Sequence, residues 1–458
     1  MKVIICGAGQ VGFNIARYIA SPYVDVTLID SNLTLVEKVQ QELDVRAVHG
    51  MASLPSTLDK AGAKEAELLI AVTQVDEINM MACQVAHSLF DVEHKIARVR
   101  QQDYLKLQWN SLYRREHLPI DSIISPEREV AKAIFDRLQV PGVFDLINFA
   151  EGAIKVAGIV CTQDTPVLDS SLAKFYQLFS DLRANIITII RDNSSIELSN
   201  DTTFKVRDRI YAVVDAVHLR RLLSVFGHEE DEGRRIVIMG GGNVGLCLAQ
   251  MLEEQGRDLR VKLVERDYSL AQKLALKLNR TTILHGDALD RDILSGATGR
   301  DSETIVAVTN DDEANILSSL LAKKSGSGRA ISLVSKDTYG PIVNQLGIDA
   351  IVNPRTITVS SILRFIRKGR VQAAHSLPEN MGEVLELQAL ETSEIVGKPL
   401  VKVGFPQQTK IGLIRRGDEV LVPKSDTIVQ AGDHIIIFTP REFIKKVEAL
   451  FAVHLEFF

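Results

Sequence analysis

Long apolar runs are missing from this chain of 458 residues. Stretches such as Ile186 to Ile190 and Ile435 to Phe438 are far shorter than the roughly 20 residues with which a helix crosses a bilayer. The chain begins with Lys2 and the apolar run Val3 to Cys6, which leaves no room for the three segments of a signal peptide. We therefore expect a cytoplasmic protein that contacts a membrane only through a partner.

Cysteine is scarce, and basic residues are not in excess. The four cysteines, Cys6, Cys83, Cys161 and Cys247, stand singly without the spacing of a metal site, so we expect small buried side chains and no metal. The formal net charge of -6 argues against a nucleic-acid partner, because phosphate binding needs clustered lysine and arginine. Hydrophobic residues at 46% and charged residues at 24% are typical of a soluble globular protein of several domains.

What the sequence does contain is an internal repeat. Val3 to Gly12 (VIICGAGQVG) recurs as Ile236 to Gly245 (IVIMGGGNVG). Later landmarks recur in the same order, and the pairs are Asp30 and Glu265, His49 and His285, Thr73 and Thr309, Asp76 and Asp312, Asn79 and Asn315, and Pro126 and Pro354. The chain is therefore predicted to hold two copies of one unit.

Each copy predicts an α/β fold with a Rossmann-like, doubly wound parallel sheet, because short apolar runs alternate with amphipathic helical stretches. A β-rich segment follows each copy and predicts a small α+β module, with a turn at Asp208 or Asp433 leading into its last strand. The acidic stretch 227–233 is the predicted linker. The expected domains are 1–140, 141–227, 234–369 and 370–458.

Both repeats open with a glycine fingerprint between a strand and a helix, followed about 20 residues later by an acidic residue. Gly7 and Gly240 suit a tight turn, Gly9 and Gly242 let the backbone approach phosphates, and Gly12 and Gly245 let the helix approach the sheet. The free N–H groups at the helix start form an anion site.

Other predicted contacts follow the second, third and fourth strands of each copy. Asp30 and Glu265 are placed to bind the hydroxyls of an unphosphorylated adenosine ribose, and Arg266 is more simply a solvated neighbour. His49 and His285 are interpreted as hydrogen-bonded strand ends rather than catalysts, since no acid, nucleophile or metal partner accompanies them. The Thr-Gln and Thr-Asn pairs are predicted to contact ribose or phosphate, or to cap the next helix.

The predicted contacts in the first copy are Gly7, Ala8, Gly9, Gln10, Val11, Gly12, Asp30, Met51, Thr73, Gln74, Arg98 and Arg100. In the second copy they are Gly240, Gly241, Gly242, Asn243, Val244, Gly245, Glu265, Asp287, Thr309 and Asn310. The copies differ where Arg98 and Arg100 fall opposite Leu333 and Ser335. The two arginines are either contacts to a ligand with several phosphates, in this cleft or that of a neighbouring subunit, or a solvated pair.

The glycine fingerprints, with Asp30, Glu265 and the HGD sequence at His285 to Asp287, resemble the TrkA family, in which TrkA-N units (also called RCK or KTN domains) alternate with TrkA-C modules. The resemblance covers the whole chain. It implies binding of NAD(H) and of ATP or ADP, and self-assembly into a ring, expected to be a tetramer. It also implies docking on a potassium-conducting membrane subunit similar to TrkH, and thus a peripheral place at the inner face of the cell membrane. Met51 departs from the family's HGD pattern.

Three functions are open to such a chain. The favoured one is a nucleotide sensor that gates a potassium channel and is not an enzyme. The alternative is an NAD-dependent oxidoreductase, against which stands the expected lack of a His–carboxylate pair, a Tyr-x-x-x-Lys pair or a metal cluster in the small modules. A scaffold with vestigial sites is disfavoured because both copies keep their glycines and carboxylates.

Overall fold

The computed structural model describes residues 1–20, 24–229, 233–256, 258–297, 304–339, 342–343, 346–366, 371–377 and 381–452. The chain divides into two compact units, which consist of residues 1–129 with 354–362 and residues 130–353 with 363–458. Residues 230–232 of the predicted linker lie outside the described residues. In the described part of the chain, no helix combines the length and the apolar character that spanning a membrane requires.

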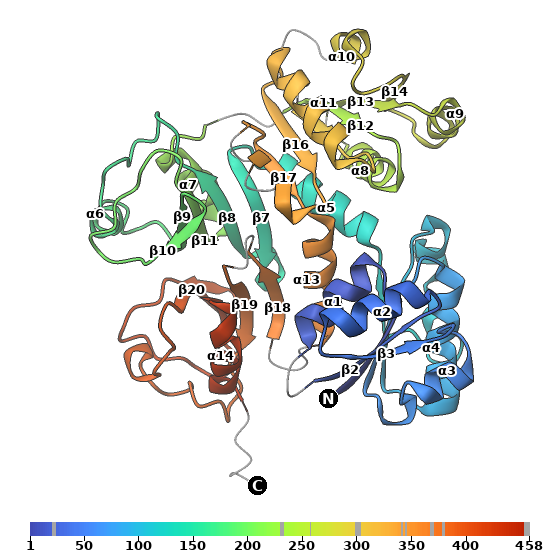
Figure 1. Ribbon diagram of the computed structural model, residues 1–458. Coiled ribbons are helices and arrows are strands. Elements are labelled where there is room, and N and C mark those ends of the chain that lie inside the picture. Colours follow the sequence, from blue (N-terminus) through green and yellow to red (C-terminus); the bar gives the residue numbers. More distant parts are fainter. Residues whose placement is uncertain are drawn as a thin grey trace. The chain divides into compact units, whose positions relative to one another are not determined.

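The first unit is built on a six-stranded parallel sheet with the strand order β3-β2-β1-β4-β5-β6. Figure 1 labels β2 and β3 of this sheet. Its elements are β1 (Lys2–Cys6), α1 (Gln10–Ile19), β2 (Asp25–Asp30), α2 (Leu33–Glu42), β3 (Arg46–His49), α3 (Pro55–Lys60), β4 (Leu68–Ala71), α4 (Asp76–Phe90), β5 (His94–Arg98), β6 (Ser122–Ile124) and α5 (Pro126–Leu138). Every residue of β4 is buried, as expected of a parallel strand covered on both faces. The order reverses between β1 and β4, which creates a crevice at their carboxyl ends.

The second unit contains a parallel sheet of the same order, β14-β13-β12-β15-β16-β17. Its elements are β12 (Arg235–Met239), α8 (Asn243–Glu254), β13 (Arg260–Glu265), α9 (Tyr268–Lys277), β14 (Thr282–His285), α10 (Arg291–Ala297), β15 (Thr304–Ala307), α11 (Asp312–Lys324), β16 (Arg329–Leu333) and β17 (Ala350–Val352). Helix α13 (Pro354–Ile366) follows β17, and its residues 354–362 belong to the first unit. The predicted class of two doubly wound parallel sheets is confirmed.

Two antiparallel sheets also belong to the second unit, in the orders β10-β9-β11-β8-β7 and β18-β19-β22-β20-β21. The first module contains β7 (Val143–Phe149), β8 (Ile154–Val160), α6 (Leu172–Leu178), β9 (Ala184–Arg191), β10 (Ser194–Ile196), β11 (Arg209–Asp215) and α7 (Leu219–Val225). The second contains β18 (Val371–Ser376), β19 (Glu383–Gln388), β20 (Lys410–Arg416), β21 (Glu419–Leu421), β22 (His434–Thr439) and α14 (Ile444–Leu450). Their strands correspond one to one, so the predicted small α+β modules are confirmed.

Short 3₁₀ helices lie between these elements. They are η1 (Ala63–Glu65), η2 (Gln102–Leu105), η3 (Leu107–Tyr113), η4 (Ala150–Gly152), η5 (Ala216–His218), η6 (Asp337–Tyr339), η8 (Leu400–Lys402) and η9 (Arg441–Phe443).

The turns predicted at Asp208 and Asp433 are present and are built alike. Arg191 donates two hydrogen bonds of 2.8 Å to the buried carboxylate of Asp208, and Arg416 donates two of 2.8 Å to that of Asp433. Such paired bonds fix both carboxylates just before the last strand of each sheet.

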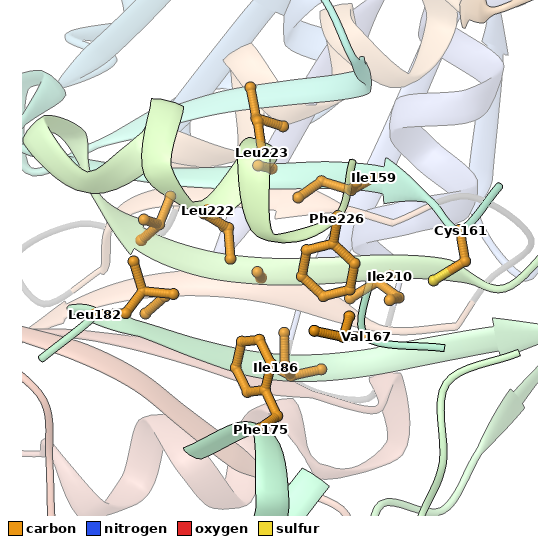
Figure 2. Close-up of a cluster of buried hydrophobic side chains, with 14 of the residues drawn as sticks. Ile159, Cys161, Val167, Phe175, Leu182, Ile186, Ile210, Leu222, Leu223 and Phe226 are labelled. Carbon is orange, nitrogen blue, oxygen red and sulfur yellow. The ribbon is translucent and has the colours of Figure 1, made fainter. Parts of the chain in front are cut away.

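The core of the first small module lies between its sheet and its two helices. Figure 2 shows Phe175, Phe226 and Cys161 in this core among aliphatic side chains such as Ile210 and Leu222. Phe204 completes the aromatic part, with its ring 5.4 Å from that of Phe226 in an edge-to-face arrangement. All four cysteines of the chain are buried, as predicted.

The end of α5 is anchored by a buried polar cluster in the second unit. The guanidinium of Arg137 binds Asp145, whose second oxygen accepts a hydrogen bond of 3.0 Å from Tyr211. Arg329, from β16, donates to the carbonyl oxygens of Arg137 and Val143 at 2.9 and 2.8 Å. This cluster joins α5, the first small module and the second parallel sheet.

Candidate functional site

The two glycine loops have the same conformation. Gly7 and Gly240 take φ values of +111° and +107°, which side chains rarely adopt. A Cβ at Gly12 would overlap the carbonyl oxygen of Gly7, and a Cβ at Gly245 would overlap that of Gly240. These glycines therefore let each chain turn sharply and let the following helix lie close to its strand.

The space beside the middle glycine is open. Gly9 precedes α1 and Gly242 precedes α8, both with extended backbone, and no atom lies within 4 Å of a Cβ built at either. Neither first helical turn contains an acidic residue. Because the N–H groups of a first helical turn have no partner within the helix, this space has the geometry and the charge for an anion.

The two strand-end carboxylates hold the glycine loops. Asp30 accepts hydrogen bonds from the N–H groups of Ala8 at 2.6 Å and Asn32 at 2.8 Å. Glu265 accepts the equivalent pair from Gly241 at 2.8 Å and Asp267 at 2.7 Å. A carboxylate oxygen can accept more than one hydrogen bond, so each group can shape its loop and still bind a hydroxyl.

The third strand of each sheet ends in a histidine that serves the backbone. His49 Nε2 lies 3.1 Å from the carbonyl oxygen of Ser31, and His285 Nε2 lies 3.1 Å from that of Arg266. Both are thus hydrogen-bonded strand ends, as predicted. Farther along, Met51 is exposed, and Asp287 lies 4.0 Å from the guanidinium of Arg266.

The threonines after the fourth strands make hydrogen bonds within their own copies. Thr73 donates from its N–H to Asn79 Oδ1 at 2.9 Å, and its hydroxyl lies 2.7 Å from the same oxygen. Thr309 and Asn315 repeat this pair at 2.8 and 2.7 Å. The threonines therefore form a clamp with an asparagine from the next helix.

Neither threonine pair caps the following helix. In the second copy the cap is Asp311, which accepts from the N–H of Ala314 at 2.9 Å. In the first copy Val75 holds the cap position and provides no side-chain bond. Gln74 and Asn310 are exposed beside the crevices.

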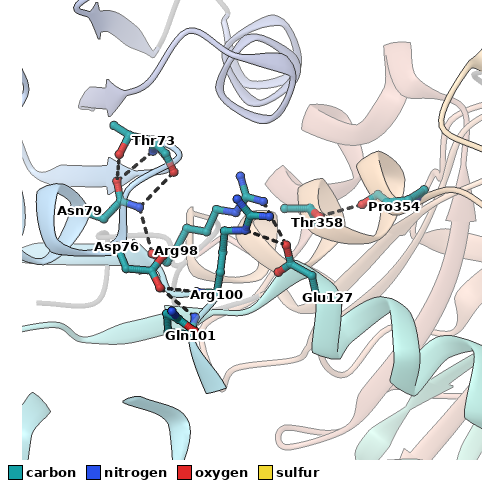
Figure 3. Close-up of polar contacts among 9 residues, drawn as sticks. All are labelled: Thr73, Asp76, Asn79, Arg98, Arg100, Gln101, Glu127, Pro354 and Thr358. Atoms are coloured by element: carbon teal, nitrogen blue, oxygen red, sulfur yellow. Dashed lines mark hydrogen bonds and ion pairs between the residues drawn. The ribbon is translucent and has the colours of Figure 1, made fainter. Parts of the chain in front are cut away.

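Two buried residues of each copy position the loop after the fifth strand, and sequence reasoning recognised them only as repeat landmarks. Asn79 donates to the carbonyl oxygen of Arg98 at 3.0 Å, and Asp76 accepts from the N–H groups of Arg100 and Gln101 at 2.9 and 2.8 Å (Figure 3).

The second copy repeats these contacts. Asn315 donates to Leu333 O at 3.0 Å, and Asp312 accepts from the N–H groups of Ser335 and Lys336 at 2.9 Å each. Their recurrence at matched positions of both copies was the sequence signal that could have identified them.

Arg98 and Arg100 both pair with one carboxylate, and the side chain of Arg100 is 40% exposed. Both contact Glu127 in the first turn of α5, with Arg98 Nη2 at 3.3 Å and Arg100 Nε at 3.1 Å from its Oε1 (Figure 3). The side chains of Arg98 and Glu127 are only 14% and 12% exposed. The two cations thus converge on one carboxylate.

A separate cavity of about 1100 Å³ lies in the second unit. Its lining includes Lys155, Arg220 and Arg234, and it reaches Ile236 at the amino end of β12. Ligands of open α/β sheets bind at the carboxyl ends of the strands, so this cavity is not the candidate site. Among the described residues, no group of three His, Cys, Asp or Glu side chains is placed to hold a metal ion.

Fold and site together define a protein with two tandem Rossmann-type domains, each with a glycine loop and open space beside the start of the following helix. The TrkA-N domain model matches residues 3–126 and 236–354, and the TrkA-C domain model matches residues 384–452. The chain is 46% identical over 458 residues to the Trk system potassium uptake protein TrkA of Azorhizobium caulinodans, with each chain covered completely. The chain therefore belongs to the TrkA family.

Two solved structures of the GsuK channel or its RCK domain share this fold. The GsuK RCK domain matches with a TM-score of 0.61 and 17% identity, over 98% of this chain and 94% of that one. The GsuK channel bound to NAD matches with a TM-score of 0.60 and 16% identity, over 98% of this chain and 78% of that one.

Proposed function

We propose that this chain is a nucleotide-sensing regulatory subunit that gates a potassium-conducting membrane protein during potassium uptake. The observation that carries the proposal is the duplicated crevice: in each copy an open helix start and a strand-end carboxylate stand where a nucleotide's phosphates and ribose need them. The curated relatives in this family are potassium uptake proteins, which supports a role in potassium uptake.

The proposed ligands are NAD(H) and ATP or ADP. Asp30 and Glu265 favour a ribose with both hydroxyls free, because a 2′-phosphate would face a carboxylate. The contact residues predicted from the sequence remain the proposed site, and the two threonine hydroxyls are positioned by their asparagine clamps. NAD in a solved structure of the same fold supports this ligand class.

The first crevice is proposed to prefer the ligand with more phosphates. Arg98 and Arg100 stand at the end of β5, where the second copy has Leu333 and Ser335. Asp76 and Asn79 fix the backbone of this loop, so the two guanidinium groups are presented from a rigid edge.

The proposed mechanism is a difference in affinity. A nucleotide shifts the subunit between two conformations only to the extent that it binds one more tightly than the other. A coupling of about 1 to 3 kcal/mol would be typical of such a regulator. The ligand is bound and released unchanged, so no reaction step is needed.

The partners are a membrane subunit similar to TrkH and further copies of this chain in a ring, proposed to be a tetramer. Exposed apolar side chains on α4 and α11 support self-assembly, since Met81 and Leu317 occupy equivalent positions and are 49% and 51% exposed. The subunit is proposed to be cytoplasmic and peripheral at the inner face of the cell membrane. The proposed domain boundaries are 1–140, 141–227, 234–369 and 370–458.

A role in binding alone can be distinguished from an oxidoreductase activity by experiment. His49 and His285 each use one ring nitrogen, Nε2, to contact a backbone carbonyl. The predicted absence of a His–carboxylate pair from the small modules is wrong, because His434 Nδ1 lies 2.8 Å from Glu386 Oε1 in the second module. Oxidation of NADH by the purified chain with any small oxidised metabolite would favour the enzyme instead.

Replacing Asp30 by alanine is expected to weaken adenosine-nucleotide binding in the first crevice by about tenfold, because a carboxylate bond to the ribose is worth about 1.5 kcal/mol or more. Titration calorimetry with ADP measures it. Glu37→Ala, which removes an exposed carboxylate from α2 of the same unit, is the matched control. Equal affinities of Asp30→Ala and the control would refute the assignment of Asp30.

A further inference from the structure

One of the contacts between the two small modules is made by a strained turn of the first module. Ala150 and Glu151 in η4 have φ values of +48° and +57°, and Gly152 follows with +94°. Left-handed backbone is uncommon for residues other than glycine, so a turn that keeps it needs support from its surroundings. Part of that support comes from the second module.

Two side chains of the second module bind the backbone of this turn. Glu386 Oε2, on β19, accepts a hydrogen bond of 3.0 Å from the N–H of Ala150. Arg415 Nη1, on β20, donates a hydrogen bond of 3.1 Å to the carbonyl oxygen of Ala150 and lies 3.1 Å from Glu151 Oε2. The second module therefore satisfies both the donor and the acceptor of the first strained residue.

His434 contacts the carboxylate that takes part in this grip. Its Nδ1 lies 2.8 Å from Glu386 Oε1, the carboxylate oxygen that does not bind Ala150. The side chain of Glu386 is only 7% exposed, whereas that of His434 is 27% exposed and can exchange protons with solvent. Because a buried carboxylate depends on its few partners, the charge of His434 affects how well Glu386 is held.

Charged groups lie near His434 on three elements. Glu386 is on β19, Arg415 is the register partner of His434 on β20, and Glu151 belongs to η4. The register partner on β19, Gln388, carries no charge. Arg415 opposes a positive imidazole, but its guanidinium contacts the η4 turn, while the imidazole contacts the carboxylate of Glu386 directly. The direct contact therefore favours the charged form of His434.

The strength of the contact depends on the proton that His434 carries. Histidine is the side chain whose charge ordinarily changes between about pH 5 and 8. A charged imidazole donates a charge-assisted hydrogen bond, which is roughly twice as strong as one from a neutral donor. This contribution is present at low pH and is lost as the pH rises. Glu386 then retains only neutral donors from His434 and Ala150, and the strained turn is held less firmly.

We propose that His434 and Glu386 form a proton-sensitive latch, in which a rise in pH loosens the contact between the two small modules. Each module follows a helix that shares residues with the first unit, since α5 begins before residue 130 and residues 354–362 of α13 belong to that unit. The latch is thereby placed to make the response to nucleotides depend on pH. This use of the latch rests on the proposed function, whereas the latch itself needs no nucleotide.

The test is hydrogen exchange, followed by mass spectrometry, on the full chain without nucleotide. The amide of Ala150 is expected to exchange about fivefold more slowly at pH 6 than at pH 8, after correction for the intrinsic pH dependence of exchange. In His434→Gln, which keeps a donor but cannot become charged, the corrected rate is expected to stay at the faster value at both pH values. His94→Gln is the matched control, because His94 lies 2.8 Å from Glu93 outside the small modules.

Equal corrected rates at pH 6 and pH 8 in the wild type would overturn the inference, and so would a pH difference that persists in His434→Gln. Glu386→Gln is a second variant, since it keeps an acceptor for Ala150 but offers the imidazole no charge, and it is also expected to lose the pH difference. If the latch is observed in a chain that binds no nucleotide, only the proposed function fails. If nucleotides bind while the corrected rates are equal, only the latch fails.

Discussion

Valine at Gly9 or Gly242 is expected to abolish one of the two nucleotide-binding events per chain while leaving the fold intact. Both glycines have φ values near -65° that valine tolerates, and nothing in the structure lies within 4 Å of the added Cβ. The new side chain fills the opening through which phosphates reach the helix N–H groups. A loss of at least about 100-fold in affinity, or roughly 2.8 kcal/mol, is expected at the altered copy.

Calorimetry with ADP and NADH measures this effect, and circular dichroism checks the fold. Gly296→Val is the control, since Gly296 also has an open surrounding but lies in α10, outside the crevice. Two unchanged binding events in Gly9→Val and Gly242→Val would show that neither fingerprint binds phosphate. By contrast, valine at Gly12 or Gly245 would collide with a backbone carbonyl, so those variants test the fold instead.

Alanine at Asp145 is expected to lower the stability of the second unit by about 3 to 5 kcal/mol, because it leaves the buried guanidinium of Arg137 without its anion. Tyr211→Phe removes only one hydrogen bond to the same carboxylate and should cost about 1 kcal/mol. Urea unfolding followed by circular dichroism compares the two variants. Equal losses in both would mean that the ion pair adds nothing to the anchoring of α5.

The sequence predicted those parts of the fold that depend on a few neighbouring residues and that occur in both copies. The sharp turn at Gly7 and the close approach at Gly12 follow from the absence of a side chain, and each has a counterpart in the second copy. The turns at Asp208 and Asp433 likewise predicted where the last strand of each small module begins. Repetition made these short patterns specific.

The interactions that the sequence did not predict join residues far apart in the chain. A strand and a long loop separate Arg98 from Glu127 in the chain, so their spacing does not predict the ion pair. The clamp by Asn79 was missed because Thr73 next to a helix start also fits a capping pattern, and side-chain geometry alone separates the two. Asp311 provides the cap in the second copy because it, and not Thr309, immediately precedes α11.

The central claim is that bound nucleotide sets the conductance of an attached potassium channel. The most direct measurement is potassium flux through the complex of this chain with its membrane subunit, reconstituted in vesicles and compared among ATP, ADP, NAD and NADH. The account predicts that flux differs between nucleotides and that Gly9→Val together with Gly242→Val removes the difference. Equal flux with all four nucleotides in the wild-type complex would contradict it.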